Sequence, residues 1–332
     1  MSKKKIFITG GAGYVGSLLV PTLLKCNYNI TVYDTLYFGS NFLPNHENLN
    51  IIRGDIRDQK HLDRACVGHD IFLHLACISN DASFVLDEKL SKTINFDCFE
   101  PMVLTAKKNG IKRFIYASTS SVYGVSNEKD VTEEHPLVPL TLYNKFKGMC
   151  EPYLFKHTDN NFEGVIFRPA TVCGYAPRLR LDVSVNILTH HAYFNKKIKV
   201  FGGSQLRPNL NIKDYCEVVE CLIKADVEKI KNQIFNVGYE NYSIQELAEM
   251  VKDVVTERFN TPIDIENVKS DDTRSYHINS DKIFKVLNFR PKYSIKEAIN
   301  SLLDAFENKH EDFSFDNDIY FNVKRIQNLK VG

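Results

Sequence analysis

Short runs of mostly apolar residues recur along the first half of the chain, and longer amphipathic stretches separate them. The runs are typical of buried strands and lie at residues 5–8, 29–33, 49–53, 71–75 and 113–117. Apolar side chains at helical spacing predict helices at residues 15–26, 86–109 and 142–157. Short buried strands that alternate with helices are typical of parallel βαβ units. The fold class we predict is therefore α/β, with a doubly wound parallel sheet.

The pattern loosens in the second half of the chain. Residues 163–167 predict one more strand, and Arg168-Pro169 end it. Beyond this point strand and helix patterns are mixed, at residues 183–195, 199–203, 214–225 and 233–237. No repeat or low-complexity linker separates the two halves. We therefore expect a smaller, mixed α/β lobe that packs directly against the first domain.

Composition excludes several classes of protein. The 332 residues carry 42 Lys and Arg against 41 Asp and Glu, so a strongly basic face for nucleic acid is not indicated. No apolar stretch approaches the roughly 20 residues that span a bilayer, and no signal-sequence pattern follows the basic start. The eight cysteines form no CxxC pair and no zinc-like spacing with histidine. We expect no metal, membrane or nucleic-acid partner, and a cytoplasmic location with reduced thiols.

The stretch ITGGAGYVG, residues 8–16, follows the first predicted strand and opens the first predicted helix. Gly10, Gly13 and Gly16 permit a tight turn and the close approach of a pyrophosphate, which a helix N-terminus binds through its free N–H groups. The second strand ends at Asp34, about 20 residues further on, where a carboxylate accepts from the hydroxyls of an adenosine ribose. The same carboxylate repels a 2′-phosphate, so the motif favours NAD over NADP. The alternative is an ordinary glycine turn with an incidental acid.

Tyr143 and Lys147 form a Y-x-x-x-K pair on one face of a predicted helix. An ammonium group close to a phenol favours the phenolate, so this pair suits proton exchange with a substrate hydroxyl. Upstream, YASTSSVYG at residues 116–124 ends a predicted strand, where open parallel sheets bind ligands. A hydroxyl there, that of Thr119 or of a neighbouring Ser, is placed to polarise the oxygen on the reacting carbon. The alternatives are a solvated helix face and an ordinary polar loop.

Together these residues resemble the extended short-chain dehydrogenase/reductase family that acts on nucleotide-linked sugars, in its epimerase/dehydratase type, which includes UDP-glucose 4-epimerase. The similarity runs from about residue 5 to about residue 300. Further matching stretches are GDIRD (54–58), HLACISN (74–80), Asn95, RPATVCGYAPRLRLD (168–182), GGSQLRPNLNIKD (202–214) and DDTRSYHINSDKI (271–283). So many matches in the same order are specific for the family and much less so for the reaction.

The resemblance implies a domain organisation and an assembly. Residues 1–168 mainly form a Rossmann domain that binds NAD, and residues 169–310 mainly form a lobe that binds the nucleotide sugar. A part around 233–260 is a candidate to return to the first domain, and 311–332 is a polar C-terminal tail. The family likeness also implies a homodimer, in which the helices around residues 97–108 and 144–156 pack across a two-fold axis.

The resemblance also implies a role for each matched position. The catalytic positions are Thr119, Tyr143 and Lys147. The positions implied to bind NAD are Gly10, Gly13, Tyr14, Val15, Gly16, Asp34, Asp55, Ile56, Leu75, Ala76, Asn95, Ser118, Tyr143, Lys147, Pro169 and Thr171. The positions implied to bind the nucleotide-diphosphate sugar are Ser79, Thr119, Asn186, Arg207 and Arg274. Guanidinium groups match phosphate oxygens, which suits the two arginines to a diphosphate.

The favoured function is an NAD-dependent nucleotide-sugar 4-epimerase that acts through a transient 4-keto sugar. The alternative enzyme is a 4-dehydrogenase or ketoreductase that exchanges NAD(H) at each turnover. The alternative outside catalysis is an NAD-binding regulatory module, for which an intact Thr119, Tyr143 and Lys147 would serve no purpose. The sugar and the nucleotide stay open.

Three departures separate this chain from subtypes of the family. The 4,6-dehydratases resemble it but carry an Asp-Glu pair directly after the catalytic Thr, and decarboxylases carry a Glu two places after it. Ser120 and Ser121 stand there, so both reactions are less favoured. The 3,5-epimerising reductases generally use NADP, against which Asp34 argues. They also use a Cys and a His near the site, and Cys77 and Cys173 leave that reading open. Ala176 replaces a Ser of the related stretch ATVxGxSPRxRxD.

Overall fold

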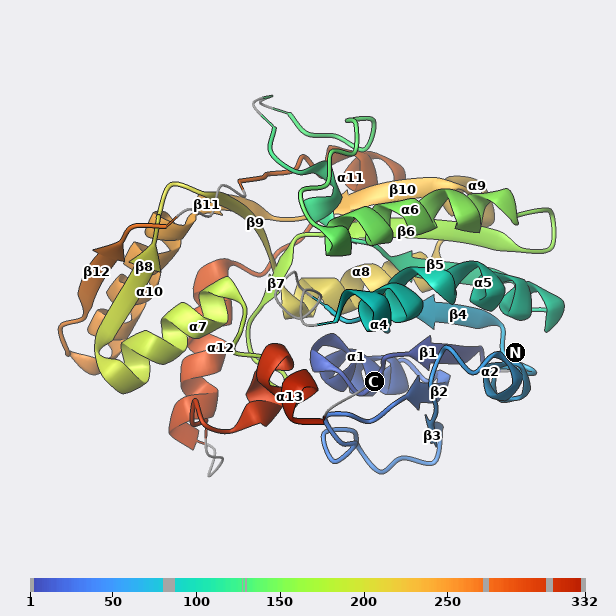
Figure 1. Cartoon of the computed structure of the whole chain (residues 1–332), viewed down its shortest axis with the longest axis horizontal. Coiled ribbons are helices and arrows are strands. Elements are labelled where there is room, and N and C mark those ends of the chain that lie inside the picture. The colour runs from blue at the N-terminus through green and yellow to red at the C-terminus, as the bar shows by residue number, and fades with distance from the viewer. Residues whose placement is uncertain are drawn as a thin grey trace.

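The computed structural model describes residues 3–79, 87–126, 128, 130–270, 275–308 and 313–329. Its largest element is a seven-stranded sheet in which every neighbouring pair of strands is parallel (Figure 1). In spatial order the strands are β10 (Gln233–Val237), β6 (Glu163–Pro169), β5 (Arg113–Ala117), β4 (Ile71–His74), β1 (Lys5–Thr9), β2 (Asn29–Asp34) and β3 (Leu49–Arg53). The order reverses between β1 and β4, so the predicted doubly wound α/β sheet is confirmed.

Helices cover both faces of this sheet. One face carries α1 (Tyr14–Lys25) and α8 (Ile212–Lys224). The other face carries α2 (Gln59–Ala65), α5 (Phe99–Lys108) and α6 (Leu142–Lys156). The short α9 (Val227–Ile230) connects α8 to the edge strand β10, and α11 (Asp281–Leu287) packs near the same strand.

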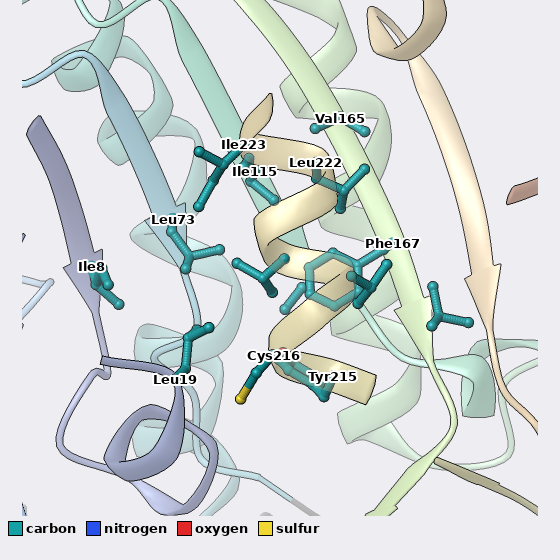
Figure 2. Close-up of a cluster of buried hydrophobic side chains, with 14 of the residues drawn as sticks. Ile8, Leu19, Leu73, Ile115, Val165, Phe167, Tyr215, Cys216, Leu222 and Ile223 are labelled. Carbon is teal, nitrogen blue, oxygen red and sulfur yellow. The ribbon is translucent and has the colours of Figure 1, made fainter. Parts of the chain in front are cut away.

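Successive side chains along each strand supply the two layers of the core, because they point to opposite faces of the sheet. Ile8 of β1 packs with α1 and α8, whereas its neighbour Phe7 packs with α2 and α5. Figure 2 shows the first layer, in which Leu222 of α8 lies near Phe167 of β6, and Ile223 of α8 near Ile115 of β5. Full burial of each such side chain contributes about 1.5–3 kcal/mol, so strands buried on both faces hold the sheet rigid beneath the site.

The helix expected over residues 86–109 is interrupted in the structure. After α4 (Glu88–Lys92), a π-turn η1 (Thr93–Asp97) precedes α5. In this turn the Asn95 side chain points inward: its Oδ1 accepts from the Ile78 N–H (2.8 Å) and its Nδ2 donates to the Ile78 carbonyl (2.9 Å). Pro101 then lies in the first turn of α5, where its missing N–H costs no helix bond. The spacing of hydrophobic residues could not predict the turn η1, because the turn depends on the contact of Asn95 with Ile78, which is distant along the chain.

The second lobe holds two small sheets and three longer helices. Strands β7 (Thr171–Cys173), β9 (Leu206–Asn211) and β11 (Glu240–Ser243) form one sheet. Strands β8 (Lys197–Phe201) and β12 (Asp264–Val268) pair in parallel to form the other. The helices are α7 (Ser184–His190), which continues into η3 (His191–Asn195), α10 (Ile244–Phe259) and α12 (Ile295–Asn308). A separate buried cluster, which includes Val185, Leu247 and Leu302, holds these elements together.

The chain crosses between the lobes more than once. Within residues 233–260, β10 joins the large sheet, while α10 packs against α7 and α12 in the second lobe. Helix α8, which lies within the range expected for the second lobe, packs against α1 on the large sheet. The predicted domain boundaries therefore describe two lobes that share segments, and the exact limits stay a prediction.

The C-terminal segment differs from the irregular polar tail expected over residues 311–332. Residues 318–320 form a 3-10 turn, η4 (Asp318–Tyr320), and the helix α13 (Asn322–Leu329) follows. Phe313, Tyr320 and Phe321 are buried in the core of the second lobe. The Asn322 Nδ2 donates to the Ser79 Oγ (2.7 Å) and the Arg325 Nε donates to the Tyr37 carbonyl (2.7 Å), so this segment reaches the first domain. The sequence pattern did not predict that this segment is folded, because its aromatic residues are scattered and do not recur at helical spacing.

In the part of the chain that the structure describes, no helix is long and apolar enough to cross a membrane. The same residues contain no group of three or more His, Cys, Asp and Glu side chains that could hold a metal ion.

Candidate active site

A cleft of about 640 Å³ lies at the carboxyl ends of the central strands, with residues of both lobes in its walls. Gly10 follows β1, Asp34 ends β2 and Ala117 ends β5, so the cleft occupies the edge at which open α/β sheets bind ligands. Arg207 of β9 and Tyr276 face it from the second lobe. Sequence positions almost the whole length of the chain apart thus meet in one cavity.

The glycine loop is shaped by close backbone contacts. Gly10 has a φ of +75°, and a Cβ there would lie 2.5 Å from the Ala76 nitrogen, two residues beyond the end of the neighbouring strand β4. A Cβ on Gly16 would lie 2.2 Å from the Gly11 carbonyl oxygen, so only glycine lets α1 begin this close to the loop. Gly13 lies at the N-cap of α1 and lines the cleft.

The N-terminus of α1 is open to an anion. No side chain caps it, and no acidic residue lies in its first turn. Its free N–H groups and its positive dipole end therefore face the cleft beside Gly10 and Gly13. Tyr14 and Val15 of the same turn also line the cleft. A pyrophosphate fits this position, because the turn supplies donors and positive potential and opposes no anion.

Asp34 is oriented by the backbone. Its Oδ2 accepts from the Ala12 N–H (3.0 Å) and its Oδ1 accepts from the Leu36 N–H (2.8 Å). Burial raises the pKa of this carboxyl, although both hydrogen bonds oppose the rise. Its position in the cleft, one strand away from the glycine loop, suits the ribose hydroxyls of an adenosine.

All but one of the other predicted cofactor positions line the cleft. The residues that line the cleft with the glycine loop are Asp55, Ile56, Leu75, Ala76, Ser118, Pro169 and Thr171. Asn95 is absent from the described lining, because both ends of its side chain hold the backbone of Ile78 behind it. Its structural role is to fix the loop after β4, on which the cleft wall depends.

The helix α6 carries the predicted catalytic pair. Thr141 caps its N-terminus by accepting from the Asn144 N–H, and Tyr143 and Lys147 lie one turn apart on the face that lines the cleft. The Lys147 Nζ donates to the Ala117 carbonyl (2.5 Å) and lies 4.6 Å from the centre of the Tyr116 ring. Lys147 is buried, so its charge acts in a poorly solvated environment beside Tyr143.

The predicted hydroxyl of Thr119 belongs to a chain of hydrogen bonds. Thr119 caps the short turn η2 (Ser120–Tyr123), and its Oγ1 lies 2.8 Å from the Ser121 Oγ. The Ser121 Oγ donates in turn to the Asn144 Oδ1 (2.5 Å), on the residue after Tyr143. Thr119 and Tyr143 therefore line one wall of the cleft and are fixed relative to each other.

A buried ion pair that the sequence did not indicate lies beneath this wall. Glu151, one turn beyond Lys147 on α6, pairs with Arg168 of β6 (Nη2 to Oε2, 2.5 Å). The Ser118 Oγ donates to the same carboxylate (2.6 Å), and the Arg168 Nη1 donates to the Tyr123 hydroxyl (2.6 Å). The pair connects α6 to β6, to the end of β5 and to η2, and so fixes the position of the catalytic helix relative to the sheet. No spacing rule links the two residues along the chain.

The structure separates the residues expected to bind the sugar nucleotide. Ser79 and Arg207 line the cleft. Asn186 is fully buried outside the described lining; its Oδ1 accepts from the Gly174 N–H (2.9 Å) and its Nδ2 donates to the Arg180 carbonyl (2.8 Å). Asn186 therefore holds the segment that precedes α7, and the expected contact with a diphosphate is not supported. Arg274 lies outside the described residues.

Other residues of the lining had no role in the sequence analysis. From the second lobe these include Lys199, Phe201, Gln205, Ile244 and Tyr276, whose ring centre lies 5.3 Å from the Arg207 guanidinium carbon. The cleft is also lined by Arg178, Arg180 and Asp182, and by Asn322 of the C-terminal segment. The resemblance had marked residues 168–182 without a function for these side chains. Of the two cysteines considered for the chemistry of a 3,5-epimerising reductase, Cys77 lines the cleft, whereas Cys173 is fully buried.

Comparison with known proteins agrees with this geometry. Residues 6–238 match the model of the NAD dependent epimerase/dehydratase family. The dTDP-D-glucose 4,6-dehydratase of Homo sapiens is 28% identical and covers 92% of this chain and 91% of its own. A putative UDP-glucose 4-epimerase of Methanocaldococcus jannaschii is also 28% identical, with 92% of this chain and 99% of its own covered.

A solved UDP-glucose 4-epimerase from Thermotoga maritima has the same fold. It superposes with a TM-score of 0.82 at 23% identity, over 92% of this chain and 100% of its own. The family model covers most of the cleft's first-lobe wall, from the glycine loop to β10. The chain therefore belongs to the NAD-dependent epimerase/dehydratase family, within the extended short-chain dehydrogenases/reductases that its motifs predict.

Proposed function

We propose that this enzyme is a nucleotide-sugar 4-epimerase that retains its NAD through each turnover. The observation that carries the proposal is the arrangement of Thr119, Tyr143 and Lys147 on one wall of a cleft that also contains the glycine loop and Asp34. Relatives with this family's fold include proteins named as UDP-sugar 4-epimerases.

Each residue of the wall has a distinct task in this reaction. Tyr143 takes the proton of the sugar hydroxyl and gives it back after the ring has presented its other face. The buried charge of Lys147 stabilises the phenolate of Tyr143. The hydroxyl of Thr119 turns from Ser121, to which it donates in the structure, and donates to the sugar oxygen instead. When bound, NAD supplies the nicotinamide that takes a hydride from the sugar carbon and returns it.

The nearest alternative reaction is a 4,6-dehydration, because the human relative is named as a 4,6-dehydratase. That reaction removes a proton at C5 and delivers one to the leaving hydroxyl, which requires an acid and a base besides the tyrosine. The positions after Thr119 are Ser120, which is buried, and Ser121, whose hydroxyl is bonded to Asn144. Serine supplies neither group at neutral pH, which supports epimerisation over dehydration.

The test is proton NMR of the purified protein with a panel of UDP-, GDP-, CDP- and dTDP-sugars, first without added NAD. We expect one sugar to convert to its C4 epimer in both directions without added cofactor. A keto sugar that accumulates only when NAD is supplied would replace the proposal with a dehydrogenase. A protein that binds NAD and converts none of the sugars would favour a regulatory module.

We also propose a homodimer through α5 and α6. Leu104 of α5 and Met149 of α6 are exposed, and Phe146 of α6 stacks on Phe96 of the preceding turn η1 (5.4 Å between centroids). Exposed apolar side chains on two helices that pack together suit a helix bundle across a two-fold axis. Sedimentation is expected to give a dimer at micromolar concentration, and Leu104→Glu a monomer. A wild-type monomer at that concentration would contradict this assembly.

The proposed compartment is the cytoplasm. All eight cysteines are free thiols, and five of them are buried. Their placement suits a reducing environment, in which thiols stay reduced.

A further inference from the structure

Arg178 of the second lobe reaches into the part of the cleft that belongs to the first domain. It lies between β7 and α7 and is 1% exposed. Its backbone N–H donates to the Ser17 Oγ (3.0 Å), which donates to the Tyr14 carbonyl in the first turn of α1 (2.9 Å). Its guanidinium carbon lies 3.6 Å from the centre of the Phe38 ring, in the loop after β2. The cation thus lies between the N-terminus of α1 and the residues that follow Asp34.

The guanidinium of Arg178 forms no ion pair within the described residues, although the carboxylates of Asp182 and Asp34 lie near enough to act on its charge. Its Nη2 donates to the neutral Asn322 Oδ1 (2.5 Å), its Nε has no hydrogen-bond partner there, and none of the described carboxylates forms an ion pair with it. Burial and the adjacent charge of Arg180 lower the pKa of Arg178 to about 9, and the charges of Asp182 and Asp34 oppose this lowering only in part. Arg180 itself pairs with Asp182 (2.6 Å).

A buried and unpaired guanidinium is costly unless an anion joins it. Two features of the surroundings specify which anion fits. The uncapped N-terminus of α1, beside Gly13, binds the phosphates of a dinucleotide, and Ser17 fixes Arg178 to this same helix. Arg207, the guanidinium suited to the substrate's diphosphate, lies on β9 in the second lobe. The cleft therefore offers one arginine to each of two diphosphates.

We propose that Arg178 binds the pyrophosphate of NAD from the side opposite the glycine loop, with its guanidinium held by Asn322 of α13. The proposal rests on the proposed function, since it requires a dinucleotide in this cleft. Three segments distant in sequence then enclose the pyrophosphate: the glycine loop, the segment before α7 and the C-terminal helix. A cofactor enclosed in this way dissociates slowly, which suits a reaction without net redox change.

The experiment measures the affinity of nucleotide-free protein for adenosine, ADP, NAD and UDP by calorimetry, in wild type and variants. Arg178→Met keeps the volume and removes the charge. We expect it to weaken ADP and NAD by about ten- to hundredfold and to leave adenosine and UDP within about twofold. Arg178→Lys should recover part of the loss. The matched control Arg207→Gln should weaken UDP and leave ADP unchanged.

A second readout separates ligand binding from a merely structural role. Because an unpaired buried charge opposes folding, nucleotide-free Arg178→Met should melt at the wild-type temperature or above it, while its gain in Tm on addition of NAD shrinks. A structural role predicts the reverse, a lower Tm without ligand and a normal gain with NAD.

The outcomes distinguish this inference from the proposed function. Loss of ADP and NAD affinity with adenosine and UDP intact supports it. Equal NAD affinity in Arg178→Met and wild type would overturn it, as would a loss confined to UDP, which would assign Arg178 to the substrate's diphosphate. If wild type itself binds no NAD, the proposed function fails as well.

Discussion

Tyr143 and Lys147 show how a weak local motif gains meaning from its surroundings. A Tyr and a Lys four residues apart on a helix usually face solvent, yet here Lys147 is buried and donates to the Ala117 carbonyl at the end of β5. That bond fixes the charge beneath the cleft wall, next to Tyr143. At the scale of single residues, chemistry depends on which side chain is desolvated and what anchors it.

Tyr143→Phe removes the proposed proton carrier and little volume. We expect kcat to fall by about 10²–10⁴-fold, with NAD affinity unchanged, because the ring and Lys147 remain in place. Steady-state kinetics and calorimetry measure the two quantities. Tyr153→Phe is the matched control, since Tyr153 lies on the same helix, packs against Phe96 and is absent from the described cleft lining. Wild-type turnover by Tyr143→Phe would exclude it as the acid and base.

At the scale of elements, α6 owes its position to the buried pair of Glu151 and Arg168. The carboxylate also accepts from Ser118, so one charged group connects α6, β5 and β6. The sequence predicted the helix, its catalytic face and the strand before Thr119. It could not predict this pair, because its partners are brought together only by the packing of the sheet.

Glu151→Gln leaves the buried Arg168 charge without a counter-charge. We expect a loss of about 3–5 kcal/mol in the free energy of unfolding, measured by urea denaturation. The control Glu100→Gln breaks a more exposed cluster with Lys156 and His157 and should cost less than about 1 kcal/mol. Similar losses in the two variants would show that the buried pair does not hold α6.

At the scale of the whole molecule, the sequence predicted the doubly wound sheet and most of the first-domain wall of the cleft. The side of the cleft expected to bind the cofactor is built from strands buried on both faces and a glycine loop, which can be recognised in the local sequence. The other side of the cleft depends on contacts between residues distant along the chain. The Asn186 side chain is bonded to Gly174, so its role in the structure is to hold the backbone. Asn322 lies at the cleft because buried aromatic residues fold the C-terminal segment back onto the protein.

The C-terminal segment should also respond to acid. The buried His190 Nε2 bonds to the Phe313 carbonyl (2.7 Å), and burial lowers the pKa of His190 from 6.5 to about 4. Since the folded state resists protonation, its stability is full above pH 6.5 and falls as the pH drops toward 4. We expect a loss of about 1–2 kcal/mol between pH 7.5 and pH 5 from this group.

Urea denaturation at both pH values measures that loss. His190→Phe should reduce the difference between them, whereas His46→Gln, on an exposed residue, should leave it unchanged. An undiminished difference in His190→Phe would assign the acid sensitivity to other groups.

The central claim, that the sugar is oxidised at C4 and reduced at the same carbon by a retained cofactor, is tested most directly with deuterium. A nucleotide sugar deuterated at C4 is incubated with the purified protein without added NAD, and the label is followed by NMR in both sugars. The account predicts that deuterium stays at C4 in the substrate and appears at C4 of its epimer. Deuterium at C6 of a 4-keto product, or in released reduced cofactor, would contradict the account and identify a dehydratase or a dehydrogenase.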